Sequence, residues 1–175
     1  MAAGCHDNSI EAVDWACLDE GTKTAMKTKG FSLDDSLGFW VYRMHTQWVA
    51  AMRRAFLAAG YDLTPEQWGV LVRIRENEGM SQSQLGEKAF KDRHNITRII
   101  DLLEGRGFIE RRPDDADRRA YRLYLTKSGR AVQEALTSVV LSSYGSALKG
   151  LASEDLLTMR RILEHVVSNL EERVQ

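Results

Sequence analysis

Apolar residues recur at three- and four-residue steps through most of the chain, the spacing that puts them on one face of an α-helix. The first long stretch predicts a helix of about 25 residues that starts near Leu33 and is ended by Gly60. Near the C-terminus, Thr126 and Ser153 stand ahead of two further apolar stripes, where they are suited to cap long helices. The periodicity therefore predicts long helices at both ends of the pattern.

Shorter elements are predicted in between. Thr64-Pro65-Glu66-Gln67 is a capping box with proline at the first helical position, and it predicts a helix that Gly79 ends. Ser81-Gln82-Ser83-Gln84 repeats the capping chemistry ahead of a short helix that ends near Ala89. Asp92 is placed to cap a fourth helix, which runs to Glu104 and is closed by glycines.

The pattern then changes from helical to β-like. Residues 108–112 and 121–125 are short, β-prone runs separated by the charged segment 113–119, and together they predict a hairpin. Two short helices joined by a tight turn and followed by a hairpin form a winged helix-turn-helix, whose second helix enters the DNA major groove. The expected fold is mainly α with a small β-hairpin wing.

These elements suggest three regions. Residues 1–32 form an N-terminal arm, in which Ser9 is placed to cap a short helix that Gly21 ends. Residues 63–126 form the winged helix-turn-helix, while 33–62 and 127–175 form a helical dimerisation domain. The terminal helices carry more apolar surface than the small winged module can cover, so a second copy of the chain is the expected partner.

Charge adds a modest indication of a polyanionic partner. The chain has 24 basic and 25 acidic residues, which excludes a globally basic protein. Residues 81–130, however, hold 12 Lys and Arg against 8 Asp and Glu, a local net charge of +4, and the remainder is at −5. Any nucleic-acid surface must therefore be local, and double-stranded DNA is the expected partner.

The predicted helix 92–104 is amphipathic. Four apolar residues point toward a core, and the opposite face carries His94, Thr97, Arg98 and Asp101. Arginine matches the two acceptors of guanine and asparagine matches adenine, so Arg98 and the flanking Asn95 are suited to base readout. Arg93 and the helix N-terminus are suited to phosphate contacts. An ordinary solvated helix is the alternative.

The hairpin tip carries three carboxylates among more numerous arginines. Asp117 is placed to brace Arg119, while Arg118 or Arg119 enters the narrow, electronegative minor groove. A surface turn whose charges neutralise one another is the alternative.

Several ordered motifs together resemble the MarR family of bacterial transcription regulators. They are Leu63 to Trp68, Gln84-Leu85, Ile96 to Ile109, Asp117-Arg118-Arg119 and Leu125 to Arg130. The resemblance covers about residues 35–172 and implies an obligate homodimer that binds a pseudo-palindromic operator and is released by a small, often aromatic or phenolic ligand, or by cysteine oxidation. It gives the recognition-helix role to Asp92–Arg98 and the wing role to Asp117 and Arg119.

The effector site implied by the resemblance lies between the dimer helices and the winged domain. The candidate residues there are Trp40, Arg43, His45, Trp48 and Trp68. Arginine is a suitable partner for an aromatic carboxylate, although each tryptophan and the histidine can equally be packed in a core.

Other functions receive less support. Cys17 is the candidate for thiol-based redox sensing, with an inert thiol as the alternative. The histidines and cysteines lack metal-ligand spacing and no catalytic motif is present, so neither a metal, a cofactor nor an enzyme activity is expected. No apolar run approaches the ~18 residues of a membrane span, and a cytoplasmic location is expected. A winged helix that binds protein instead of DNA remains the main rival.

Overall fold

The structure is a computed structural model that describes residues 32–34, 36–89, 93–114 and 120–172. The chain divides into two compact units, residues 1–47 and 48–175. The arm helix expected between Ser9 and Gly21 lies outside the described residues. None of the helices in the described part is long and apolar enough to cross a membrane.

The first unit contains the start of helix α2 (Leu37–Ala58). Its first turn is capped by Ser36, whose hydroxyl accepts a hydrogen bond from the backbone N–H of Phe39 at 3.2 Å. The helix thus begins four residues after the predicted start at Leu33, because the serine side chain competes for the first free N–H groups.

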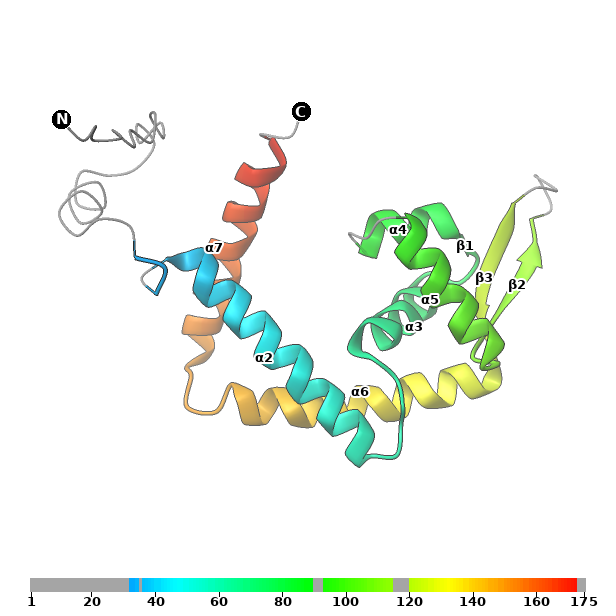
Figure 1. The fold of residues 1–175 in the computed structure, drawn as a ribbon, viewed down its shortest axis with the longest axis horizontal. Coiled ribbons are helices and arrows are strands. Elements are labelled where there is room, and N and C mark those ends of the chain that lie inside the picture. Colours follow the sequence, from blue (N-terminus) through cyan, green and yellow to red (C-terminus); the bar gives the residue numbers. More distant parts are fainter. Residues whose placement is uncertain (1–31, 35, 90–92, 115–119, 173–175) are drawn as a thin grey trace, which may run out of the picture. The chain divides into compact units, whose positions relative to one another are not determined.

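The second unit holds the remainder of α2 and a small α/β body (Figure 1). Its further elements are α3 (Pro65–Glu76), β1 (Met80–Ser81), α4 (Gln82–Ala89), α5 (Arg93–Gly105), β2 (Ile109–Pro113), β3 (Tyr121–Leu125), α6 (Lys127–Ala147) and α7 (Ser153–Glu172). Helix α6 begins at the end of the sheet and packs along α3. The mainly helical fold with a β wing is confirmed.

The wing is a three-stranded antiparallel sheet in the order β1-β3-β2. The predicted hairpin is present, with Ile109 opposite Leu125 and Pro113 opposite Tyr121. Strand β1 was not predicted: Met80 pairs with Leu123 across the sheet. Two residues are too short to show an alternating pattern, and their partner lies more than 40 positions away in the sequence.

Local capping explains most helix boundaries. The Thr64–Gln67 capping box is present in both directions, with hydrogen bonds of 3.0 and 3.2 Å. Helix α5 ends in a Schellman motif: Phe108 N–H donates to the Leu103 carbonyl, and Gly107, at φ +70°, donates to that of Glu104. Ser153, expected as a cap, is instead the first residue of α7, where the Asp155 carboxylate accepts from the N–H of Ala152.

The core lies within the winged body, by which we mean α3, α4, α5 and the sheet. It joins the end of α2 with α3, α4, α5 and the sheet, and it extends along α6 as far as Val140. Its fully buried side chains include Phe56, Leu71, Ile74, Leu85, Ile96, Ile100, Leu103 and Leu136. Helix α7, by contrast, has no buried residue.

Candidate nucleic-acid interface

Helix α5 has one face in the core and one at the surface. The buried face is the predicted one, formed by Ile96, Ile99, Ile100 and Leu103, each at most 2% exposed. Arg98 and Asp101 are exposed on the other side, while Thr97 is partly covered. The apolar ridge therefore fixes which side of the helix is available to a ligand as large as a DNA groove.

Polar contacts engage three of the predicted DNA-contact residues, Asn95, Thr97 and Arg98. Gln82, the first residue of α4, donates from Nε2 to the Thr97 hydroxyl at 2.5 Å. Arg98 reaches Asn95 Oδ1 from Nη2 at 3.4 Å, a long contact on one face of the helix. Sequence reasoning missed Gln82, because the only signal was its place just after the capping serine Ser81, fifteen residues from its partner.

Part of the predicted site lies outside the described residues. Arg93 and His94 form the start of α5, but their side chains are outside the described set. The wing-tip residues Asp117, Arg118 and Arg119 also fall outside it, as does Cys17.

The strands of the wing carry arginines that are engaged within the protein. Arg111 on β2 binds two carboxylates of α5, Asp101 at 2.5 Å and Glu104. Arg122 on β3 binds Asp114 and donates from Nη1 to the Gly79 carbonyl at 3.0 Å. These arginines brace the wing, so they add less to the surface charge than their number in the sequence suggests.

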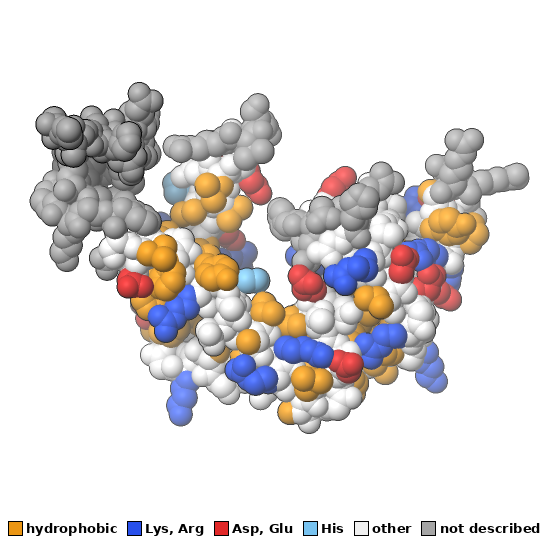
Figure 2. All heavy atoms as spheres, viewed as in Figure 1, with side chains coloured by type: hydrophobic (Ala, Val, Ile, Leu, Met, Phe, Trp, Pro, Cys, Tyr) orange, Lys and Arg blue, Asp and Glu red, His pale blue; other side chains and the backbone are white. Residues whose placement is uncertain are grey.

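Arg112 is the more exposed arginine of the wing strands. It stacks on the Tyr124 ring with its guanidinium carbon 4.3 Å from the ring centroid, and it pairs with Glu110 on its own strand at 2.5 Å. Lys and Arg side chains alternate with Asp and Glu over the visible part of the winged body (Figure 2). The described residues on this face therefore form a surface of mixed charge and not a continuous basic band.

A small ionic cluster joins the end of α2 to the end of α5. Arg53 binds the Asp62 carboxylate and also donates to the Leu63 carbonyl at 2.8 Å, while Arg106 donates to the Asp62 carbonyl at 2.6 Å. The hydrogen bond and charge of Arg53 hold the pKa of the exposed Asp62 below its ordinary value, with a smaller contribution from the charge of Arg106.

The candidate effector residues fall in both units. In the first unit, Trp40 is half exposed and donates to the Asp34 carbonyl at 2.7 Å. Arg43 lies over the Trp40 ring, with its guanidinium carbon 5.2 Å from the centroid, and His45 is exposed. This stacking keeps the Arg43 charge beside an aromatic surface.

In the second unit, Trp48 and Trp68 are partly buried against the core. Trp48 packs on Tyr144 at 4.7 Å between ring centroids, and Trp68 meets Phe56 edge-on at 6.2 Å. Two buried polar atoms have no hydrogen-bond partner in the described part of the chain: Trp68 Nε1 on α3 and Gln133 Oε1 on α6. Leaving a buried donor or acceptor without a partner costs free energy. The helices that carry these two atoms, α3 and α6, pack together.

Comparison with known proteins identifies this architecture. A family model described as "MarR family" matches residues 63–121, from the start of the helix-turn-helix to the second wing strand. An HTH-type transcriptional regulator of Bacillus subtilis, YybA, is 37% identical over 110 residues, which cover 63% of this chain and 73% of the relative. The chain belongs to the MarR family. As a MarR-family protein it is a DNA-binding transcriptional regulator.

Solved structures of the family agree with this MarR fold. A probable transcriptional regulator from Pseudomonas aeruginosa superposes with a TM-score of 0.71 at 31% identity, covering 77% of this chain and 99% of that one. The transcriptional repressor CouR, bound to a 23-mer DNA duplex, gives 0.66 at 27% identity, covering 79% and 94%. CouR from Rhodococcus jostii bound to p-coumaroyl-CoA gives 0.67 at 25% identity, covering 77% and 94%.

Proposed function

We propose that this regulator is a homodimeric repressor that binds a pseudo-palindromic operator and leaves it when a small aromatic or phenolic ligand binds. The observation that carries the proposal is helix α5, whose buried isoleucine ridge leaves Arg98 facing outward beside Thr97. Arginine presented in this way can donate to both N7 and O6 of guanine. Repression is proposed by similarity to CouR, a transcriptional repressor.

The proposed DNA contacts comprise the first half of α5 and the wing tip. They are Arg93, His94, Asn95, Thr97, Arg98, Asp117, Arg118 and Arg119. The α5 residues would read bases and phosphates in the major groove, and the tip would reach the adjacent minor groove. Gln82 joins this set as a positioning residue, because its bond to Thr97 limits the rotation of that side chain.

Dimerisation is supported by the apolar surface of α7. Leu157, Met159, Ile162, Val167 and Leu170 are all exposed in the single chain, at 40–67% of their surface. Packing against a second copy would remove this apolar surface from water, which lowers the free energy of the pair. A twofold axis would then set the two recognition helices about 34–36 Å apart, one turn of the duplex.

The proposed effector site uses aromatic and polar groups. Trp68 Nε1 and Gln133 Oε1 supply an unpaired donor and an unpaired acceptor, which suit a ligand with an oxygen-bearing group. Trp40, Arg43, His45 and Trp48 are the further candidates. The aromatic character of the ligand is supported by CouR, which is similar to this chain and has been solved with p-coumaroyl-CoA.

The DNA proposal can be tested by measuring affinity against salt. The protein first selects its operator from a library of random duplexes, and binding is then measured by fluorescence anisotropy. Because the proposed interface includes several phosphate contacts, the affinity for the duplex should fall at least about tenfold between 50 and 200 mM salt. Arg98→Ala is expected to weaken operator binding by about fivefold to 150-fold and to relax preference at one base pair.

The matched control is Arg161→Ala, which removes one positive charge from the exposed surface of α7. It should change operator binding by less than about twofold. If no sequence is enriched, or if binding does not depend on salt, the winged helix functions as a protein-interaction module and the proposal is wrong.

A further inference from the structure

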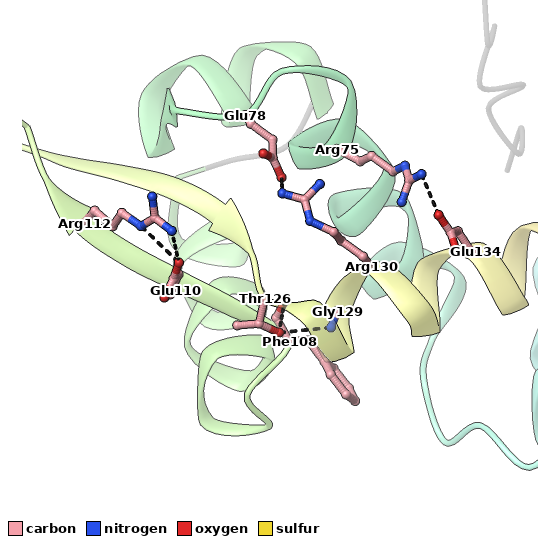
Figure 3. Close-up of polar contacts among 9 residues, drawn as sticks. All are labelled: Arg75, Glu78, Phe108, Glu110, Arg112, Thr126, Gly129, Arg130 and Glu134. Carbon is pink, nitrogen blue, oxygen red and sulfur yellow. Dashed lines mark hydrogen bonds and ion pairs between the residues drawn. The ribbon is translucent and has the colours of Figure 1, made fainter.

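The start of α6 is held closely against the winged body. Thr126 N–H and Oγ1 bond the carbonyls of Phe108 and Gly107, and Ser128 also donates to Gly107 at 2.7 Å. Gly129 lies so close to the segment before β2 that a Cβ there would be 1.8 Å from the Phe108 oxygen. Figure 3 shows the two residues side by side. Such contact leaves no room for sliding, so this end of α6 is a fixed point for the winged body.

Just beyond this fixed point, two ion pairs connect α6 to the end of α3 and to the turn that follows it. Arg75 Nη2 is 2.6 Å from Glu134 Oε1, and Arg130 Nη2 is 2.5 Å from Glu78 Oε1 (Figure 3). Residues 130 and 134 are one helical turn apart on one face of α6, as Figure 3 shows. We call these four residues the charge clamp.

The two ion pairs of the clamp have opposite orientations: α6 supplies the carboxylate in one pair and the arginine in the other. Along α6 a positive residue precedes a negative one, and on the α3 side Arg75 likewise precedes Glu78. Because the pairs run antiparallel, a shift of α6 by one turn would bring like charges together, which is unfavourable. The arrangement therefore favours a single register of α6 against the winged body.

A contribution to folding stability does not explain why these two ion pairs are present. The paired side chains are 30–62% exposed, and ion pairs at such exposure contribute little to folding. Their position matters more, because they lie between the helix that continues toward α7 and the body that carries α5. A small rotation about the Gly129 contact would be magnified at the outer face of α5.

We propose that Arg75, Glu78, Arg130 and Glu134 are positioning residues for operator binding, which hold the winged body at the angle on α6 that DNA requires. This inference rests on the proposed dimer, because a dimer must place both recognition helices in successive grooves at once. Loss of the correct angle lowers the effective concentration of the second helix at its half-site.

The sharpest test is Glu134→Arg, since charge and geometry predict opposite results. Adding positive charge strengthens binding to DNA phosphates in general. The clamp predicts instead that operator affinity falls by about fivefold to thirtyfold, because each subunit loses a pair and gains repulsion between two arginines. Affinity for an unrelated duplex should be unchanged or higher.

Two variants provide controls. Glu76→Arg makes the same charge change on α3 but breaks only a pair with Arg73 within that helix, so operator binding should not weaken. The charge swap Arg75→Glu with Glu134→Arg restores the pair in reverse at wild-type net charge, and affinity should return to within about threefold. Operator binding by Glu134→Arg as tight as by Glu76→Arg would overturn the proposal.

A second measurement does not depend on DNA. Spin labels are attached at Glu87→Cys on α4 and at Ala147→Cys on α6, in a chain whose Cys5 and Cys17 are replaced by serine. When labelled chains are diluted in unlabelled ones, the distance between the two labels reports the angle between the winged body and α6 within one chain. Glu134→Arg should shift or broaden the distance distribution, while Glu76→Arg leaves it unchanged. An unchanged distance distribution would overturn the positioning role of the clamp, whether or not the protein binds DNA. Failure of the wild-type protein to bind DNA would instead count against the proposed function.

Discussion

At the scale of single residues, Gly129 shows how a sequence motif can have a structural reason that the sequence does not reveal. Leu125-Thr126-Lys127-Ser128-Gly129 predicted a capped helix, and Thr126 does accept the Gly129 N–H at 3.0 Å. Glycine itself is required by a close approach to Phe108, twenty-one positions earlier. Periodicity and capping are local signals, so they could predict the helix start but not this contact.

The residue-scale prediction concerns Gly129→Ala. The new Cβ would meet the Phe108 carbonyl, which is backbone and cannot rotate away, so α6 or β2 must move. We expect the free energy of unfolding to fall by about 3 kcal/mol or more, measured by urea denaturation at fixed protein concentration. Gly69→Ala, inside α3 with no atom within 4 Å of its Cβ, should instead raise it by up to ~1 kcal/mol. Equal effects of the two changes would contradict this explanation.

At the scale of elements, the starts of α3, α4 and α6 were predictable because a helix cap depends on only a few neighbouring residues. The Thr64 and Ser81 boxes form as expected. Contacts between elements were not predictable in the same way: β1 pairs with a distant strand, and Arg111 finds its partners on α5 only after both have folded. From sequence, Arg111 and Arg112 are neighbouring cations of the same kind, yet they have different roles.

That difference gives the element-scale prediction. Arg111→Met leaves Asp101 and Glu104 without their shared counter-charge, so the unfolding free energy should fall by about 1–2 kcal/mol. Arg112→Met removes a 60% exposed side chain that stacks on Tyr124 and has its ion pair within its own strand, so the loss should stay below ~1 kcal/mol. Thermal unfolding followed by circular dichroism distinguishes the two variants, and a larger loss for Arg112→Met would refute the assignment.

At the scale of the whole molecule, the sequence suggested self-association because its terminal helices carry more apolar surface than one chain can cover. The structure of the second unit supports that reasoning, since α7 has no buried residue. A row of apolar side chains runs along one side of the helix: Leu156, Met159, Leu163 and Val167. Local pattern could predict this row, but the partner surface depends on a second chain and has no local signal.

The whole-molecule prediction is that a charge placed in this row prevents dimerisation. Met159→Glu puts a carboxylate where the partner would exclude water, so the dissociation constant should rise at least about thirtyfold in sedimentation equilibrium. His165→Glu adds the same charge to an exposed position on another side of α7 and should leave association nearly unchanged. Because a monomer binds only one half-site at a time, Met159→Glu should also lose operator affinity while keeping its folded circular dichroism spectrum. A wild-type chain that stays monomeric at micromolar concentration, or two variants that dimerise equally well, would show that this face of α7 has another use.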